Sequence, residues 1–240
     1  MAVLIAVFAA GVVRGFSGFG AGMIVVPVAA AAYSPQHAVV VFLVLDTLPA
    51  LPLVIPTLRK VSLAELAPVV AGYACLLPLG IWFLKTGDTG VLRWCMSAVI
   101  ILAAVCLWSG WKYTGPRSLA VRAGVGGLAG FLGGSMGVPG PPVVLYWMAQ
   151  SNGAGFVRAH LIVFLTVAQW FAGIGLISAG LVTREALTLG FISAPLFLVA
   201  LLIGARMFGQ ATETAYRRIA FGIIITAAVL TLPALDMLRG

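Results

Sequence analysis

The chain has 240 residues, of which 62% are hydrophobic and only 8% are charged. Water-soluble globular domains carry about 25% charged residues, so this composition excludes a soluble protein and predicts an integral membrane protein. A mean hydropathy of +1.15 supports the same conclusion. The net charge of +8 does not indicate nucleic-acid binding, because basic residues in the short loops of a membrane protein account for it.

Eight apolar segments follow one another along the chain, separated by charged residues or by breaks rich in glycine and proline. Most of them have the length of a membrane-spanning helix, about 20 residues. They are 1–33 (interrupted at 14–22), 37–56, 66–84, 91–111, 123–149 (interrupted at 133–142), 159–182, 186–205 and 219–235. The sequence therefore predicts an all-α polytopic membrane protein of about eight helical segments, without a soluble domain.

Similar stretches recur in the same order in the two halves of the chain, which indicates an internal repeat. The matching pairs are 15–27 with 130–142, 41–47 with 163–169, and 98–105 with 222–229. We predict two membrane repeats of four segments each, residues 1–113 and 118–240, within one integral membrane domain. The alternative explanation is chance similarity between apolar segments.

The positions of the basic residues bear on how the first segment of each half lies in the membrane. If all eight segments cross, the basic residues divide almost evenly between the two faces, against the usual bias toward the cytoplasm. If the first segment of each half instead turns back at its glycine-rich break, most basic residues share one face. That face carries Arg59, Lys60, Lys112, Arg117, Arg122, Arg158, Arg206, Arg217 and Arg218, and the other carries Lys85, Arg93, Arg184 and Arg239. The halves are then inverted, as in many secondary transporters; a kinked helix that crosses fully is the alternative.

Both glycine-rich breaks are candidate anion sites. In hydrocarbon, an interrupted backbone persists only beside protein, water or a ligand, and the N-terminus of the helix that resumes favours an anion. The candidate substrate-binding residues are Arg14, Gly15, Ser17, Gly18, Gly20 and Gly22 at the first break, and Gly133, Gly134, Ser135 and Gly137 at the second. The alternative is that these small residues serve close packing between helices.

Polar side chains inside apolar segments are costly to bury and usually functional. Arg14 lies at the first break, and Asp46 lies midway along the segment 37–56. We expect either an ion pair between them, or an Arg14 that binds an anion beside an Asp46 that couples transport to protons. Gln169 matches Thr47 in the repeat and is a further candidate to line the cavity.

The sequence contains no motif for catalysis or nucleotide binding. It lacks GxxxxGK followed by Ser or Thr, HExxH and CxxC, and its only histidines are His37 and His160. We therefore predict no enzymatic activity, no catalytic residue, no metal site and no cofactor.

Several of these features together resemble the TauE/SafE family of sulfite exporters, over nearly the whole chain. They are the stretch 14–27, its counterpart 130–142, the pairs Leu79-Gly80 and Ile203-Gly204, and Arg93 and Arg217 at the start of the last helix of each half. The resemblance implies a multi-pass transporter of the bacterial inner membrane that carries sulfite, sulfonates of the sulfoacetate or taurine type, or thiosulfate. It places the family's helix breaks at 15–22 and 133–140. Here the second break is unusually rich in proline, with Pro139, Pro141 and Pro142.

The sequence thus predicts a secondary transporter that works by alternating access around a site between its halves. A small sulfur-containing anion and the lipid bilayer are the expected partners, nucleic acid is not, and a homo-oligomer is left open. The alternatives are a channel for anions or small solutes and a scaffold subunit that transports nothing.

Overall fold

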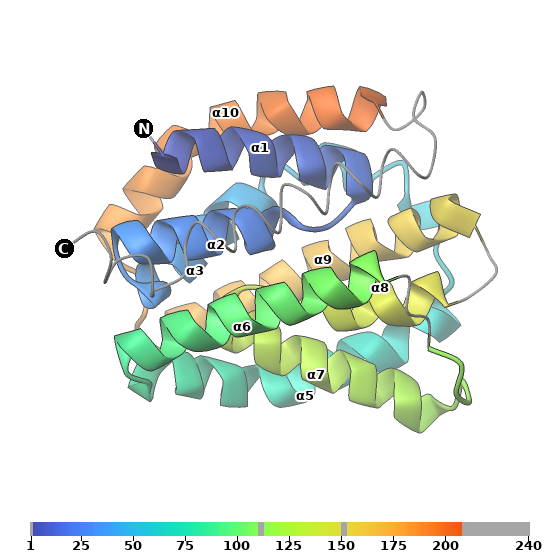
Figure 1. Cartoon of the computed structure of the whole chain (residues 1–240). Coiled ribbons are helices and arrows are strands. Elements are labelled where there is room, and N and C mark those ends of the chain that lie inside the picture. The colour runs from blue at the N-terminus through green and yellow to red at the C-terminus, as the bar shows by residue number, and fades with distance from the viewer. Residues whose placement is uncertain (1, 110–112, 150–152, 208–240) are drawn as a thin grey trace.

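A computed structural model describes residues 2–109, 113–149 and 153–207. The predicted segment 219–235 and the basic residues Lys112, Arg217, Arg218 and Arg239 lie outside these residues. Within the described residues the fold is all-helical, as predicted (Figure 1). The helices are α1 (Ala2–Ser17), α2 (Ala21–Ala32), α3 (Pro35–Thr47), α4 (Leu51–Val54), the short 3-10 helix η1 (Leu58–Lys60), α5 (Leu63–Thr86), α6 (Thr89–Trp108), α7 (Leu119–Met136), α8 (Gly140–Met148), α9 (Gly153–Ser178) and α10 (Arg184–Met207).

Five of the described helices, α5, α6, α7, α9 and α10, are long and apolar enough to cross a membrane. Helices α1, α2 and α3 are apolar but shorter. Large hydrophobic side chains such as Trp82, Ile177 and Ile192 are exposed on the outside of the bundle. A surface of this kind is compatible with lipid and unfavourable in water.

The first apolar segment of each half is a helical hairpin. Helices α1 and α2 pack against each other and are joined by residues 18–20, and α7 and α8 are joined in the same way by residues 137–139. Gly18, Gly20 and Gly137 have positive φ angles of 80°, 90° and 65°, a backbone conformation that glycine adopts without a steric penalty. Each break is therefore shorter than the interruption predicted from the sequence.

The predicted segment 37–56 is not one continuous helix. Helix α3 begins after Ser34, whose side chain accepts a hydrogen bond from the backbone N–H of His37, and it ends at Thr47. Pro49 and Pro52 follow, and a proline inside a helix removes a hydrogen bond and clashes with the preceding turn. Only the short helices α4 and η1 form between this point and α5.

Helix α1 packs in parallel along α10, at the top of the view in Figure 1. Gly11 lies against Phe197, and Gly15, one turn further, lies against Leu201. A Cβ atom at Gly15 would overlap the carbonyl oxygen of Leu201, so only glycine permits this approach.

Helices α5 and α7 form the equivalent parallel pair at the bottom of the view in Figure 1. Gly130 lies against Tyr73, and Gly134 lies against Leu77. The first helix of each predicted repeat thus packs along a helix of the other repeat. The two predicted repeats are interlocked in the described part of the chain and do not form separate bodies.

The two hairpins correspond to each other in a register that differs from the sequence match. Helix α1 ends at Ser17 and α7 at Met136, and the next residue in each case is a glycine with positive φ. By this correspondence Gly15 matches Gly134, whereas the sequence comparison matched it to Gly130. The shift is four residues, about one helical turn, which leaves the same face of the helix toward its neighbour.

Candidate functional site

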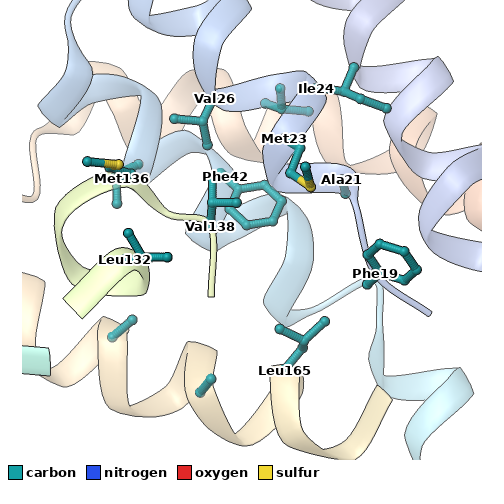
Figure 2. Packing of buried hydrophobic residues seen from close by; sticks show 14 of the residues in the cluster. Phe19, Ala21, Met23, Ile24, Val26, Phe42, Leu132, Met136, Val138 and Leu165 are labelled. Carbon is teal, nitrogen blue, oxygen red and sulfur yellow. The ribbon is translucent and has the colours of Figure 1, made fainter. Parts of the chain in front are cut away.

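The breaks of the two hairpins meet in the interior of the protein. The would-be Cβ of Gly22, in the first turn of α2, lies close to the carbonyl oxygen of Gly137 in the second break. Gly140, at the start of α8, faces Phe19 in the first break. Figure 2 shows the buried hydrophobic side chains around this meeting point, among them Met23, Phe42 and Val138.

A small cavity of about 20 Å³ lies at this junction. It is large enough for about one water molecule. Its lining comes from both breaks and from α1, α2, α3, α8 and α9, so both predicted repeats contribute to it. The lining residues are Arg14, Gly20, Ala21, Gly22, Met23, Phe42, Asp46, Gly137, Val138, Pro139, Gly140, Pro141, Leu165 and Gln169.

The polar end of the cavity is an ion pair between Arg14 and Asp46. Arg14 Nε donates to Asp46 Oδ1 at 2.6 Å, and Arg14 Nη2 lies 3.3 Å from Asp46 Oδ2. Gln169 Nε2 donates to the same Oδ2 atom at 3.3 Å. Both charged side chains are 2% exposed. Of the alternatives that the sequence left open for this pair, the structure shows the ion pair.

Arg14 also holds the backbone of the first break, since its Nη1 atom donates to the carbonyl oxygen of Gly18. The guanidinium therefore has two roles: it neutralises Asp46, and it satisfies a carbonyl group that the end of α1 leaves without a helical partner. Because Asp46 compensates its charge, an anion at this site has to compete with the carboxylate for Arg14.

The two helix N-termini at the cavity differ in the hydrogen bonds that they offer. Helix α2 starts after Gly20 without a side-chain cap, and Gly20, Ala21 and Gly22 all line the cavity. Helix α8 also starts without a side-chain cap, but Pro141 and Pro142 in its first turn have no N–H group. The α2 terminus is thus the better donor of the two.

Six of the predicted site residues line the cavity. They are Arg14, Gly20, Gly22, Asp46, Gly137 and Gln169. The sequence placed them in four separate stretches of the chain, and the fold brings them together. Their contact with a substrate stays a prediction.

The other predicted site residues lie next to the cavity but do not line it. They are Gly15, Ser17, Gly18, Gly133, Gly134 and Ser135. The Ser17 hydroxyl is within hydrogen-bonding distance of the carbonyl oxygens of Val13 (2.7 Å) and Phe19 (2.6 Å), and it accepts the N–H of Phe19. The Ser135 hydroxyl donates to the carbonyl oxygen of Phe131 at 2.6 Å.

The glycines of this second group have structural contacts. Gly15 packs on α10, and Gly133 and Gly134 pack on α5. Close packing was the alternative explanation for small residues in the breaks, and these three positions show such packing.

Sequence reasoning missed Arg158, which reaches from α9 to the last turn of α1, just before the first break. Its Nη2 and Nε atoms donate to the carbonyl oxygens of Gly15 at 2.7 Å and Phe16 at 3.1 Å. The sequence showed only a basic residue near the start of an apolar segment. Its partners are backbone atoms, which no side-chain pattern reveals.

Among the described residues, no three His, Cys, Asp or Glu side chains are arranged to hold a metal ion. The residues that line the cavity include donors of hydrogen bonds to an anion. A guanidinium, a side-chain amide and an uncapped helix N-terminus can all donate to the oxygens of an anion.

Comparisons with known proteins agree with the resemblance noted in the sequence. The model of a protein family described as sulfite exporter TauE/SafE matches residues 3–231. The chain is similar to a probable sulfite/organosulfonate exporter TauE from Cupriavidus necator, with 27% identity over 233 residues that cover 92% of this chain and 89% of the relative. No solved structure matches the chain significantly.

Proposed function

This chain belongs to the sulfite exporter TauE/SafE family of multi-pass membrane transport proteins, and from that premise we propose that it is a secondary transporter of small sulfur-containing anions in the bacterial inner membrane. The cargo is sulfite, a sulfonate of the sulfoacetate or taurine type, or thiosulfate. The observation that carries the proposal is the cavity between the two breaks, with a buried arginine and an uncapped helix N-terminus in its wall.

In the proposed binding mode, the oxygens of the anion accept hydrogen bonds from Arg14, from the first N–H groups of α2 and from Gln169. A planar guanidinium binds oxyanions with two parallel hydrogen bonds. In the described structure Asp46 accepts these bonds instead. The substrate therefore binds when Asp46 releases Arg14, either because the carboxylate takes up a proton or because α3 moves. This makes Asp46 the candidate for proton coupling.

Ser17 and Ser135 have a secondary place in this binding mode. Their hydroxyl groups are engaged by backbone atoms of their own hairpins. These hydroxyl groups can donate to a substrate only after they lose their present hydrogen bonds. We therefore propose that their main role is to stabilise the two hairpin connections. Gly15, Gly133 and Gly134 contribute by letting the helices around the cavity pack closely.

We further propose that the two repeats are inverted in the membrane and that transport occurs by alternating access. In each half the first segment is a hairpin that turns back at its break, and the two breaks face each other at the cavity. Hydrogen bonds join the start of α5 to the starts of α7 and α9, through Arg122 with Ala64 and His160 with Ser62. At the opposite end, Lys85 on α5 donates to the carbonyl oxygen of Ala179, just after α9. This arrangement supports the topology that collects most basic residues on one face.

The cavity volume supports a closed state of the transporter. With room for about one water, the site has to widen before it admits an anion with three or more heavy atoms. The proposed cause of the widening is a movement of the two hairpins relative to α3 and α9, the other helices that line the cavity.

A screen of thermal stability tests the proposed substrate class. The purified protein is heated with sulfite, thiosulfate, sulfate, taurine, isethionate or sulfoacetate, and with chloride and acetate as controls. A ligand that binds only the folded state stabilises it by about 2.7 kcal/mol at a hundredfold excess over Kd. We expect one or more sulfur anions, but neither control, to raise the melting temperature. Equal curves for all anions would contradict the proposal. Saturable uptake into proteoliposomes then separates a transporter from a channel.

A further inference from the structure

The end of α1 lies in the protein interior, where its last carbonyl groups need hydrogen-bond donors. A helix leaves its final carbonyl oxygens without intrahelical partners, and an unpaired buried carbonyl is unfavourable. Arginines satisfy three carbonyl groups here. Arg158 binds the carbonyl oxygens of Gly15 and Phe16, and Arg14 binds that of Gly18.

Arg158 belongs to the second predicted repeat and lies against Gly18 of the first break. A Cβ atom at Gly18 would be 3.2 Å from Arg158 Cγ and 3.3 Å from the carbonyl oxygen of Arg158. The side chain is half-buried. Its positive charge lies at the C-terminal end of α1, where the helix dipole favours a cation.

The same helix also contacts the polar end of the cavity. Gln169 lies about three helical turns beyond Arg158 on α9, which puts both side chains on one face of that helix. Gln169 donates to Asp46, the partner of Arg14. Helix α9 of the second repeat thus makes two contacts near Arg14. Arg158 binds the backbone beside Arg14, and Gln169 binds Asp46, the counterion of Arg14.

We propose that Arg158 is a positioning residue for the anion site: it fixes the last turn of α1, and thereby the guanidinium of Arg14, to the second repeat. A displacement of this turn moves Arg14 relative to Asp46 and to the N-terminus of α2. The role needs the planar guanidinium, because its two donor atoms bind two successive carbonyl groups, whereas a lysine ammonium binds as a point charge. The binding part of the test rests on the proposed function.

The test compares Arg158→Gln and Arg158→Lys with a matched control. The control is Arg117→Gln, since Arg117 also donates to a backbone carbonyl, that of Ala149, but on the exposed surface away from the cavity. The readouts are the Kd for sulfite, the apparent KM and maximal rate of sulfite uptake into proteoliposomes, and the melting temperature without anion.

We expect Arg158→Gln to raise the Kd and KM for sulfite by about tenfold or more, as for the loss of charge-assisted hydrogen bonds. Arg158→Lys falls between this variant and the wild type, and Arg117→Gln behaves as the wild type. A wild-type Kd in Arg158→Gln, or a Kd that rises only in proportion to a lower melting temperature, overturns the proposal. If Arg158→Gln does not fold, Arg158→Lys decides by the same criterion.

Hydrogen exchange of residues 15–22 in the absence of any anion separates the two proposals. If no sulfur anion stabilises the wild type, the proposed substrate class fails, and the exchange rates still decide on Arg158. Faster exchange in Arg158→Lys than in the wild type and in Arg117→Gln supports the positioning of the first break. Equal rates in all three proteins overturn it.

Discussion

Asp46 Oδ1 lies 2.6 Å from Arg14 Nε, and both side chains are almost completely buried where the two hairpins meet. The pair joins α3 to the last turn of α1 and lines the cavity between the predicted repeats. The two opposite charges neutralise each other, so the pair adds no net charge to the cavity wall.

Removal of one partner of this pair is expected to destabilise the protein strongly. Asp46→Ala leaves the Arg14 guanidinium buried without a counterion, at a cost of about 3–5 kcal/mol. The double variant Arg14→Met with Asp46→Leu is expected to lose less than Asp46→Ala alone, because it leaves no unpaired charge. Equilibrium unfolding of the three proteins in detergent measures the difference. Equal losses in the single and the double variant would contradict the expected cost of the unpaired Arg14 charge.

The close contact of α5 and α7 predicts a contrast between two glycines of the same helix. Gly130→Ala places a methyl group against the carbonyl oxygen of Tyr73, and overpacking of this kind costs about 1–3 kcal/mol. Gly124 has open space around its would-be Cβ, so Gly124→Ala is expected to change the stability little. The melting temperatures of the two variants check this contrast. A Gly130→Ala variant as stable as Gly124→Ala would mean that the helices are further apart.

The second break predicts a graded response at Gly137. This residue ends α7 with φ 65° and ψ 20°, and its N–H donates to the carbonyl oxygen of Gly133 at 3.0 Å. A left-handed backbone costs other residues about 1–2 kcal/mol, and asparagine tolerates it best. We expect stability to decrease from the wild type to Gly137→Asn and further to Gly137→Val. The same stability for the asparagine and valine variants would argue against this conformation.

The hairpin formed by α1 and α2 predicts that its two ends lie on one side of the membrane. In a background in which Cys75, Cys95 and Cys106 are replaced, single cysteines at Val3 and Ser34 should react with an impermeant thiol reagent from the same side. A cysteine at Lys60 should react from the opposite side and serves as the control. Reaction of Val3→Cys and Ser34→Cys from opposite sides would instead support a helix that crosses fully.

The sequence was sufficient to predict an all-helical membrane protein, its family and the polar residues of the cavity. Arg14, Asp46 and Gln169 were recognisable because a polar side chain inside an apolar segment is costly unless it has a partner. Which glycines line the cavity could not be predicted. Gly15 and Gly22 both belong to the glycine-rich stretch, but Gly15 packs on Leu201 of α10, whereas Gly22 faces Gly137 in the second break.

Two other features depended on information that a sequence pattern does not carry. The register of the two hairpins is set by the residue that takes a positive φ, and several glycines in each break compete for that position. Arg158 binds backbone carbonyl groups of α1. Every residue has such a group, so the sequence does not indicate which ones an arginine binds. Arg158 was therefore counted only among the charges that orient the protein in the membrane.

The affinity for sulfite of two variants of the Arg14–Asp46 pair is the decisive test of the proposed anion site. Asp46→Asn keeps the shape of the side chain but removes the charge that competes for Arg14, so we predict a lower Kd for sulfite than in the wild type. Arg14→Gln removes the principal donor, and we predict that it abolishes binding. Isothermal titration of the wild type and both variants compares the three values. Unchanged sulfite affinity in Arg14→Gln, or weaker binding in Asp46→Asn, would contradict an anion site built on the competition between sulfite and Asp46 for Arg14.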